Sequence, residues 1–283
     1  MKVLLTLLML LNIVYAKSLF SNKEQAQSSE YIGNLKDLLI ATQRTRGTTN
    51  SYLHGNKSIL LVIYSNRNDM QDAIVNMQAS PLASDNVINL KSMDISNALM
   101  KINTKAFKQD PSDVFQNYTT QISQILILAQ TLSKKVSKDL NKFGKDATNV
   151  MMYEMLPLTE YVGQLRGYGS GVAAKGKLND TDIEQLSVLA SRVQSLNSKL
   201  QKQVRILEEK YPSKVKLAIQ ISMKKINNGV KNYISLTSKK LMGKHIDVDA
   251  TDYFDEGTKI ITNITIAYDS LNNEILKDSD GWL

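Results

Sequence analysis

Two arginines, Arg46 and Arg166, fall where the helical spacing of the sequence predicts a buried side chain. The guanidinium group is planar and donates two parallel hydrogen bonds, a geometry that matches planar oxyanions and that lysine lacks. A buried guanidinium without a partner is strongly destabilising. Each arginine is therefore expected to meet either a carboxylate from another helix, which is the usual structural solution, or an anionic ligand.

The first arginine lies on a seam with three-four spacing, which is typical of one face of a helix. The seam consists of Ile32, Leu35, Leu39, Thr42, Arg46, Thr49 and Leu53. Thr42 and Thr49 place hydroxyl groups one turn to either side of Arg46, and no carboxylate shares this face. This seam alone favours an ion pair with another helix over a ligand.

An internal repetition favours a ligand over an ion pair. When the sequence is aligned with itself at an offset of 120 residues, a second seam superposes on the first. The second seam consists of Met152, Met155, Thr159, Val162, Arg166, Gly169 and Ala173. Gly47 and Gly167 follow the two arginines, although Gly inside a helix costs up to about 1 kcal/mol relative to Ala. The repetition of a costly feature favours one small anion held by both arginines, with something approaching the backbone closely at these glycines.

Short polar breaks divide the rest of the chain into helices that must position the arginines. The breaks are predicted at residues 55–58, 80–86, 109–113, 176–180, 211–213 and 243–252. Pro111 and Pro212 are each predicted at a helix start. Between residues 112 and 175 only Gly144 and Pro157 interrupt the pattern, which predicts either one long kinked helix or two helices with a tight join. The fold is predicted to be all-α, with eight long helices in two up-and-down four-helix bundles that form a pseudo-repeat.

The first residues are predicted to be a secretory signal peptide, because Lys2 precedes an apolar run, Val3–Val14, that is too short to span a bilayer. Cleavage is expected after Ala16, and the product is expected in the periplasm. An uncleaved anchor is the alternative. The predicted domains are thus residues 1–16 as signal peptide, 17–143 as the first bundle and 144–283 as the second.

Composition narrows the function classes. The chain has 283 residues, 42% of them hydrophobic, which is enough for one or two substantial cores. It has no cysteine, which excludes disulfides, thiol catalysis and cysteine metal sites. The net charge of +8 favours small anions or an acidic surface, and an exported protein rarely meets nucleic acid.

Other chemistry is sparse. His54 and His245 are the only histidines, and no carboxylates stand near them at the spacing of a metal site. No phosphate-binding glycine loop or nucleophile elbow is present. The sequence therefore predicts no catalytic residues, no metal, no cofactor and no enzymatic activity.

Two segments of the sequence resemble the paired motifs of the NIT domain, the nitrate- and nitrite-sensing module. The first is Gln43-Arg44-Thr45-Arg46-Gly47, continuing through Asn50 to Leu53, and the second is Gly163-Gln164-Leu165-Arg166-Gly167. The resemblance implies an all-helical fold of two four-helix bundles, with one arginine from each half lining a nitrate site. It places Arg46 and Arg166 in that role. Arg44 departs from the acidic or polar residue common at its position.

The ligand-binding residues predicted from the seams and the resemblance together are Arg46, Arg166, Thr42, Thr49, Asn50, Gly47 and Gly167.

NIT domains usually precede a signalling output, and none follows in this sequence. The resemblance therefore predicts an exported nitrate or nitrite sensor that reports occupancy by contact to a membrane histidine kinase or chemoreceptor, with the choice between monomer and homodimer left open. The alternative is a structural or adhesive helical surface protein in which both arginines pair with carboxylates. A hydrolase is a remote third reading.

Overall fold

The computed structural model describes the backbone of residues 2–279 and the side chains of residues 23–278. This part of the chain contains no strand. Its α-helices are α1 (Lys2–Leu53), α2 (Leu60–Ala79), α3 (Asn86–Lys105), α4 (Pro111–Val136), α5 (Lys142–Val150), α6 (Leu156–Lys175), α7 (Asp180–Lys210), α8 (Leu217–Leu236) and α9 (Ala250–Ser279). A π-helical turn, Met151–Met155, joins α5 to α6 without a break. The described residues thus form eight long helices, which confirms the predicted all-α class.

The predicted signal peptide, residues 1–16, lies outside the part of the chain whose side chains the structure describes. Within the described part, no helix combines the length and the apolar character needed to cross a membrane.

Several helix ends carry capping chemistry, and two of them, at Pro111 and Gly176, lie where the sequence predicts a helix boundary. Pro111 occupies the first position of α4, and the carboxylate of Asp110 before it accepts the backbone N–H of Ser112 at 2.8 Å. Asn179 and Asp182 form a reciprocal capping box at the start of α7. Gly176 ends α6 with a φ of 65°, a left-handed conformation that glycine adopts without strain.

The prediction that Pro212 begins a helix is wrong. Helix α7 ends at Lys210, and α8 begins only at Leu217. Between them the backbone N–H of Lys214 donates to the carbonyl of Tyr211 at 3.0 Å, so Pro212 is the second residue of a four-residue turn. The fixed φ of proline suits that turn position as well as it suits the first turn of a helix.

The chain passes from the first bundle to the second through residues 137–141. Asn141 begins the new helix by accepting the backbone N–H of Gly144 at 2.7 Å, so the boundary predicted between residues 143 and 144 falls in the first turn of α5. Pro157 does not break the long helix. It lies directly after the π-helical turn, where the wider backbone spacing accommodates a residue that lacks an N–H.

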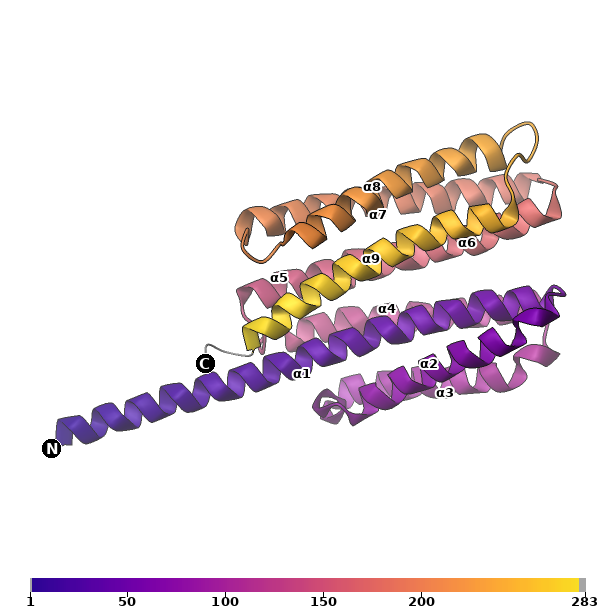
Figure 1. Cartoon of the computed structure of the whole chain (residues 1–283). Coiled ribbons are helices and arrows are strands. Elements are labelled where there is room, and N and C mark those ends of the chain that lie inside the picture. Colours follow the sequence, from indigo (N-terminus) through magenta and orange to yellow (C-terminus); the bar gives the residue numbers. More distant parts are fainter. Residues whose placement is uncertain (1, 280–283) are drawn as a thin grey trace.

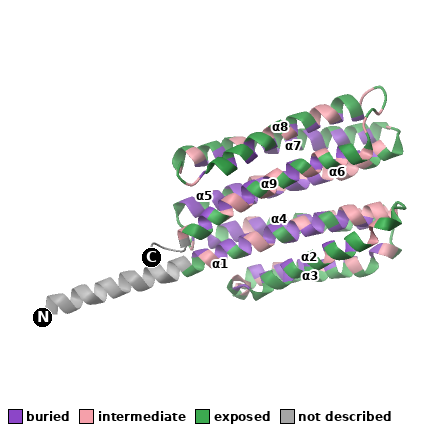
Figure 2. Ribbon diagram, in the orientation of Figure 1, coloured by how far each residue is buried: buried purple, intermediate pink, exposed green. Residues whose placement is uncertain are grey.

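Helices α1 to α4 form one bundle and α5 to α9 the other, and Figure 1 shows the two lying side by side. Helix α9 packs along α1 at the boundary between them. Buried residues concentrate on the inward faces of both bundles, as Figure 2 shows. One apolar core continues from bundle to bundle.

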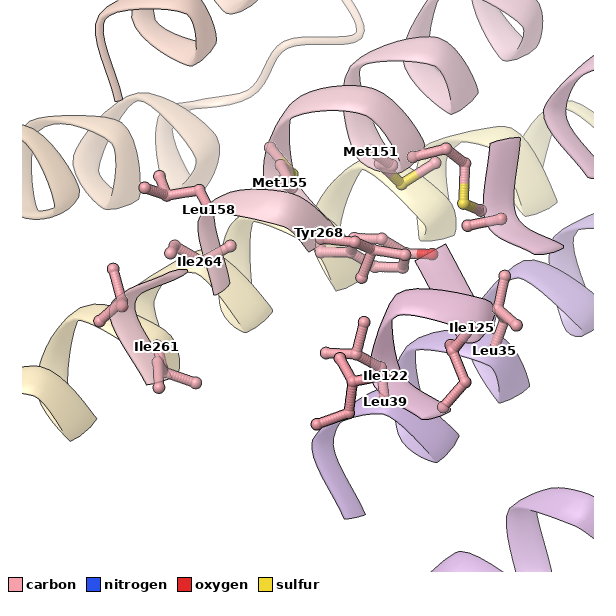
Figure 3. Packing of buried hydrophobic residues seen from close by; sticks show 14 of the residues in the cluster. Leu35, Leu39, Ile122, Ile125, Met151, Met155, Leu158, Ile261, Ile264 and Tyr268 are labelled. Carbon is pink, nitrogen blue, oxygen red and sulfur yellow. The ribbon is translucent and has the colours of Figure 1, made fainter. Parts of the chain in front are cut away.

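Figure 3 shows this shared core, where Leu35 and Ile122 of the first bundle approach Met151 and Tyr268 of the second. Tyr268 is buried, and its hydroxyl donates to the backbone carbonyl of Ile32 at 2.8 Å. The boundary between the bundles is therefore packed like a protein interior. The two arginines lie on α1 and α6, one in each bundle.

Candidate anion-binding site

Arg46 lies on α1 and is only 2% exposed. Its Nη1 donates to Oε1 of Glu160 at 2.6 Å, and its Nη2 donates to Oε2 of the same carboxylate at 3.2 Å. Nη1 also donates to the hydroxyl of Thr119 at 2.9 Å. The guanidinium carbon lies 4.9 Å from the centre of the Phe115 ring. Arg46 therefore makes a bidentate ion pair across the bundle boundary, since Glu160 belongs to α6.

The Glu160 carboxylate is 3% exposed and is held from two further directions. Gln43 Nε2 donates to Oε2 at 2.6 Å, and Gln164 Nε2 donates to Oε1 at 2.8 Å. Gly163 provides the room for this arrangement, because a Cβ there would lie 3.2 Å from Gln43 Nε2 and 3.5 Å from Arg46 Nη2. Four N–H donors thus converge on one buried carboxylate, and these hydrogen bonds replace the water that burial removes.

Arg166 lies on α6 and is 8% exposed, but its surroundings differ from those of Arg46. Its Nη1 donates to the hydroxyl of Thr258 at 2.8 Å, and its guanidinium carbon lies 4.3 Å from the centre of the Phe254 ring. Its Nε is buried and has no hydrogen-bond partner. Among the described side chains, no carboxylate lies within ion-pair distance of Arg166.

The charge of Arg166 is correspondingly disfavoured. Burial lowers the pKa of Arg166 from its usual value to about 10. Among the smaller influences, Tyr233 and Glu160 raise this pKa, whereas the positive charges of Arg46 and Arg44 lower it further. Arg166 still carries its proton at neutral pH. It is a desolvated cation in the field of a second cation, and that is an environment an incoming anion would stabilise.

The two arginines are held by matching pairs of residues. Arg46 stacks on Phe115 and donates to Thr119, and Arg166 stacks on Phe254 and donates to Thr258. In both cases the phenylalanine and the threonine are one helical turn apart, on α4 and on α9. The pseudo-repeat of the sequence is therefore also a repeat of the site.

The repeat does not extend to the carboxylate, and this difference creates the asymmetry in charge. Glu160 lies six residues before Arg166, and the residue six before Arg46 is Ile40. If the symmetry were complete, a carboxylate at position 40 would pair with Arg166. The two arginines and Glu160 carry a net charge of +1 by count, and the surplus lies on Arg166.

The structure brings only part of the predicted binding set to this site. Arg46 and Arg166 are there, and Gly167 lies beside it, because a Cβ on Gly167 would be 3.6 Å from the Phe115 ring. A Cβ on Gly47 would meet no atom within 4 Å, so that glycine does not make room for a neighbouring element. The contacts of the remaining predicted residues lie elsewhere.

Thr42 donates to the carbonyl of Leu38 at 2.7 Å and lies 3.5 Å from the sulfur of Met70, inside the first bundle. Thr49 lies close to Tyr118 in the same bundle. The carbonyl of Asn50 is 2.8 Å from the His54 ring in the last turn of α1. Thr42 and Thr49 were grouped with Arg46 because they share its three-four seam, but residues of one seam can face different neighbours. Asn50 was included because it stands in the motif that resembles the NIT domain.

Sequence reasoning missed several residues of the site: Glu160, Gln43, Gln164, Phe115, Thr119, Phe254 and Thr258. A signal for four of them was present, since Phe-x-x-x-Thr occurs at 115–119 and again at 254–258. No comparable signal marked Glu160 as the partner of Arg46, because that pairing depends on how α1 and α6 pack. No group of three or more His, Cys, Asp or Glu side chains in the described part of the chain could hold a metal ion.

Fold and site together define an all-helical, two-bundle protein with a buried cationic centre built from both bundles. Residues 37–276 match the family model described as nitrate and nitrite sensing (NIT). The chain belongs to this NIT family. No curated protein matches the sequence.

Among solved structures, the fold is similar to that of the NasR transcription antiterminator, with a TM-score of 0.70 at 12% sequence identity. The similarity covers 96% of this chain and 74% of that one. At this level of identity the comparison shows a shared fold.

Proposed function

We propose that this protein binds one nitrate or nitrite ion between its two bundles, with Arg166 supplying the charge. The observation that carries the proposal is the buried Arg166 guanidinium, which has an unpartnered Nε and no ion-pair partner among the described residues. Nitrate is planar and monovalent, so it matches both the geometry of a guanidinium edge and the surplus of one positive charge.

The Arg46–Glu160 pair gives the ion a second effect. An anion beside Arg166 enters the field of Glu160 and competes with it for Arg46. Because Glu160 belongs to α6 and Arg46 to α1, a weaker Arg46–Glu160 pair loosens one of the polar links between the bundles. A change in how the bundles pack against each other is a signal that a partner could read.

The test is thermal unfolding of the full chain with increasing nitrate, nitrite, sulfate or chloride. At a hundredfold excess over Kd, a ligand that binds only the folded state stabilises it by about 2.7 kcal/mol. Nitrate or nitrite is expected to raise the Tm more than chloride at equal ionic strength. An equal response to every anion would point to general salt effects and would overturn the proposal.

Export, a periplasmic location and a membrane histidine kinase or chemoreceptor as partner remain predictions from the sequence. Binding without catalysis also belongs to the proposal, and the ligand class is a small anion rather than nucleic acid. Whether the protein is a monomer or a homodimer stays open.

One observation favours a second candidate, a structural helical protein without a ligand. The Arg46–Glu160 pair is complete on its own, as that reading predicts for both arginines. Arg166 distinguishes the two candidate functions, because a structural protein without a ligand has no counter-charge for this arginine. If Arg166→Met folds and keeps the nitrate response of the wild type, the structural reading is favoured.

A further inference from the structure

Helix α3 presents a row of exposed side chains on the outer side of the first bundle. These residues recur at intervals of three and four, so they share one face of the helix, opposite its buried face. We call this row the α3 stripe: Leu90, Met93, Asn97, Met100 and Thr104. Leu90 is 64% exposed, and the two methionines are 45% and 48% exposed. Large apolar side chains that gather on one exposed face are typical of a surface that another protein covers.

The fold leaves the α3 stripe free for a partner. Figure 1 shows α2 and α3 on the side of the first bundle that faces away from the second, with α1 and α4 in between. Exposed residues follow the outer faces of both helices in Figure 2. The anion site lies at the boundary with the second bundle, so a partner bound to the α3 stripe does not cover it.

Two opposite charges flank the α3 stripe on one side. Asp94 and Lys101 are both exposed, and each directly follows a methionine of the stripe. Neither makes an ion pair with another described side chain. They are seven residues apart, which is about 10.5 Å along the helix axis, so they do not pair with each other. A partner that packs along the stripe therefore meets a negative charge at one point and a positive charge two turns further on.

We infer that the α3 stripe binds a second copy of this chain, with the two α3 helices packed antiparallel about a two-fold axis between residues 97 and 98. Asp94 and Lys101 lie at equal distances on either side of that axis. Asp94 of each copy therefore faces Lys101 of the other, which gives two ion pairs. The same axis brings Met93 of each copy close to Met100 of the other and places the two Asn97 side chains at the centre.

The charges also select the direction of packing. In a parallel pair, the charged flanks of the two helices would lie on opposite sides of the contact, and neither Asp94 would meet a Lys101. Charges at the edge of a contact fix its orientation more than they add to its affinity. The apolar side chains of the stripe supply the attraction, and the antiparallel arrangement is the one that joins it to complementary charge.

The dimer is expected to be reversible. One face of one helix buries less surface than the roughly 800 Å² per partner of a stable dimer. Each chain also has its own complete core, which includes no residue of the α3 stripe. The monomer is therefore folded before it associates, and the fraction of dimer rises with protein concentration.

The experiment is sedimentation equilibrium of the full chain over a wide range of protein concentration. The wild type is expected to pass from monomer to dimer as the concentration rises. Asp94→Lys and Lys101→Asp each place like charges opposite one another in a homodimer, so each is expected to weaken association about tenfold or more. An equimolar mixture of the two variants is expected to regain it, because one variant is positive at both positions and the other is negative at both.

Leu90→Asn removes the most exposed apolar side chain of the stripe and is also expected to weaken association. Val188→Asn, at a 58% exposed position of α7, is the matched control and should associate like the wild type. A wild type that stays monomeric at every concentration overturns the inference. A dimer that neither charge reversal weakens, or a mixture of the two variants that does not regain association, overturns it as well, because Asp94 would then not face Lys101. Circular dichroism checks that each variant stays helical.

Discussion

The charge at the centre of the molecule is set by single residues. Glu160 neutralises Arg46 through two hydrogen bonds, whereas Ile40 stands where an equivalent carboxylate would neutralise Arg166. Burying an unpaired cation destabilises a fold, so the ligand-free protein is expected to be less stable than a variant with an apolar side chain at position 166. This cost is what an anion relieves when it binds.

Glu160→Gln tests whether the carboxylate competes with the ligand. The amide keeps the shape but leaves Arg46 without a counter-charge, and breaking a buried ion pair in this way costs about 3–5 kcal/mol. The variant without ligand is therefore expected to unfold at lower temperature or denaturant concentration. Nitrate affinity is expected to rise about tenfold or more, because Arg46 becomes free to donate to the ion. Chemical unfolding and calorimetric titration measure the two effects.

Glu184→Gln, on the exposed side of α7, is the control and should leave both quantities unchanged. If Glu160→Gln bound nitrate no more tightly than the wild type, Glu160 would be a purely structural partner of Arg46.

The packing of α9 against α6 fixes the position of the Arg166 side chain. A Cβ added to Gly257 of α9 would lie 2.9 Å from Arg166 Cβ, 3.0 Å from its Cγ and 3.0 Å from the Tyr233 hydroxyl. Such distances require the arginine stem or the helix to shift, because the neighbouring atoms are not the flexible end of a side chain. Gly257 is thus the glycine that lets α9 approach Arg166.

Gly257→Ala is expected to lower both stability and nitrate affinity, since overpacking a core typically costs about 1–3 kcal/mol. Gly47→Ala is the matched comparison, because a Cβ there meets nothing and alanine is favoured over glycine in a helix by up to about 1 kcal/mol. That variant is expected to gain stability and to keep its nitrate affinity. Equal behaviour of the two variants in thermal unfolding and titration would show that packing at Gly257 does not position Arg166.

The positions of the helices could be predicted from the sequence because the residues that begin and end a helix act locally. Asp110-Pro111 and Gly176 each act through the backbone next to them, and the structure places a helix start and a helix end there. Pro212 misled because proline fits a turn as well as a helix start. The connection at residues 137–141 was harder to predict from the sequence. Asn141, which caps the start of α5, comes before Gly144, the glycine on which the predicted boundary was based.

The arginines themselves were predictable because a charged residue on an apolar seam is conspicuous, and both are buried in the structure. Their neighbours were harder to predict. Glu160 pairs with a residue 114 positions away, and only the packing of α1 against α6 brings the two together. Thr42 and Thr49 share the seam of Arg46 and yet face the inside of the first bundle, because a short side chain cannot reach across the boundary as arginine does.

At the scale of the whole molecule, one apolar core runs through both bundles, and the Arg46–Glu160 pair lies at the same boundary. Tyr268 of α9 reaches the backbone of α1, and Leu35, Ile122 and Met151 pack around it. Separating the bundles would expose this surface to water. The two bundles are therefore expected to unfold together.

Calorimetric unfolding of the full chain is expected to show one transition, with equal calorimetric and van't Hoff enthalpies, despite the two-bundle architecture. Tyr268→Phe removes the hydrogen bond to Ile32 and should lower the free energy of unfolding by about 1 kcal/mol while keeping one transition. Two resolved transitions in the wild type would mean that the bundles are energetically separate and that the shared core does not couple them.

The most direct measurement of the central claim is calorimetric titration of the wild type and Arg166→Met with nitrate, in parallel and at fixed ionic strength. The wild type is expected to bind nitrate. Arg166→Met is expected to fold with equal or higher stability and to lose the binding event assigned to the bundle boundary. Arg205→Met, which alters an exposed arginine on α7, should match the wild type. Wild-type nitrate binding that persists unchanged in a folded Arg166→Met variant would contradict the account.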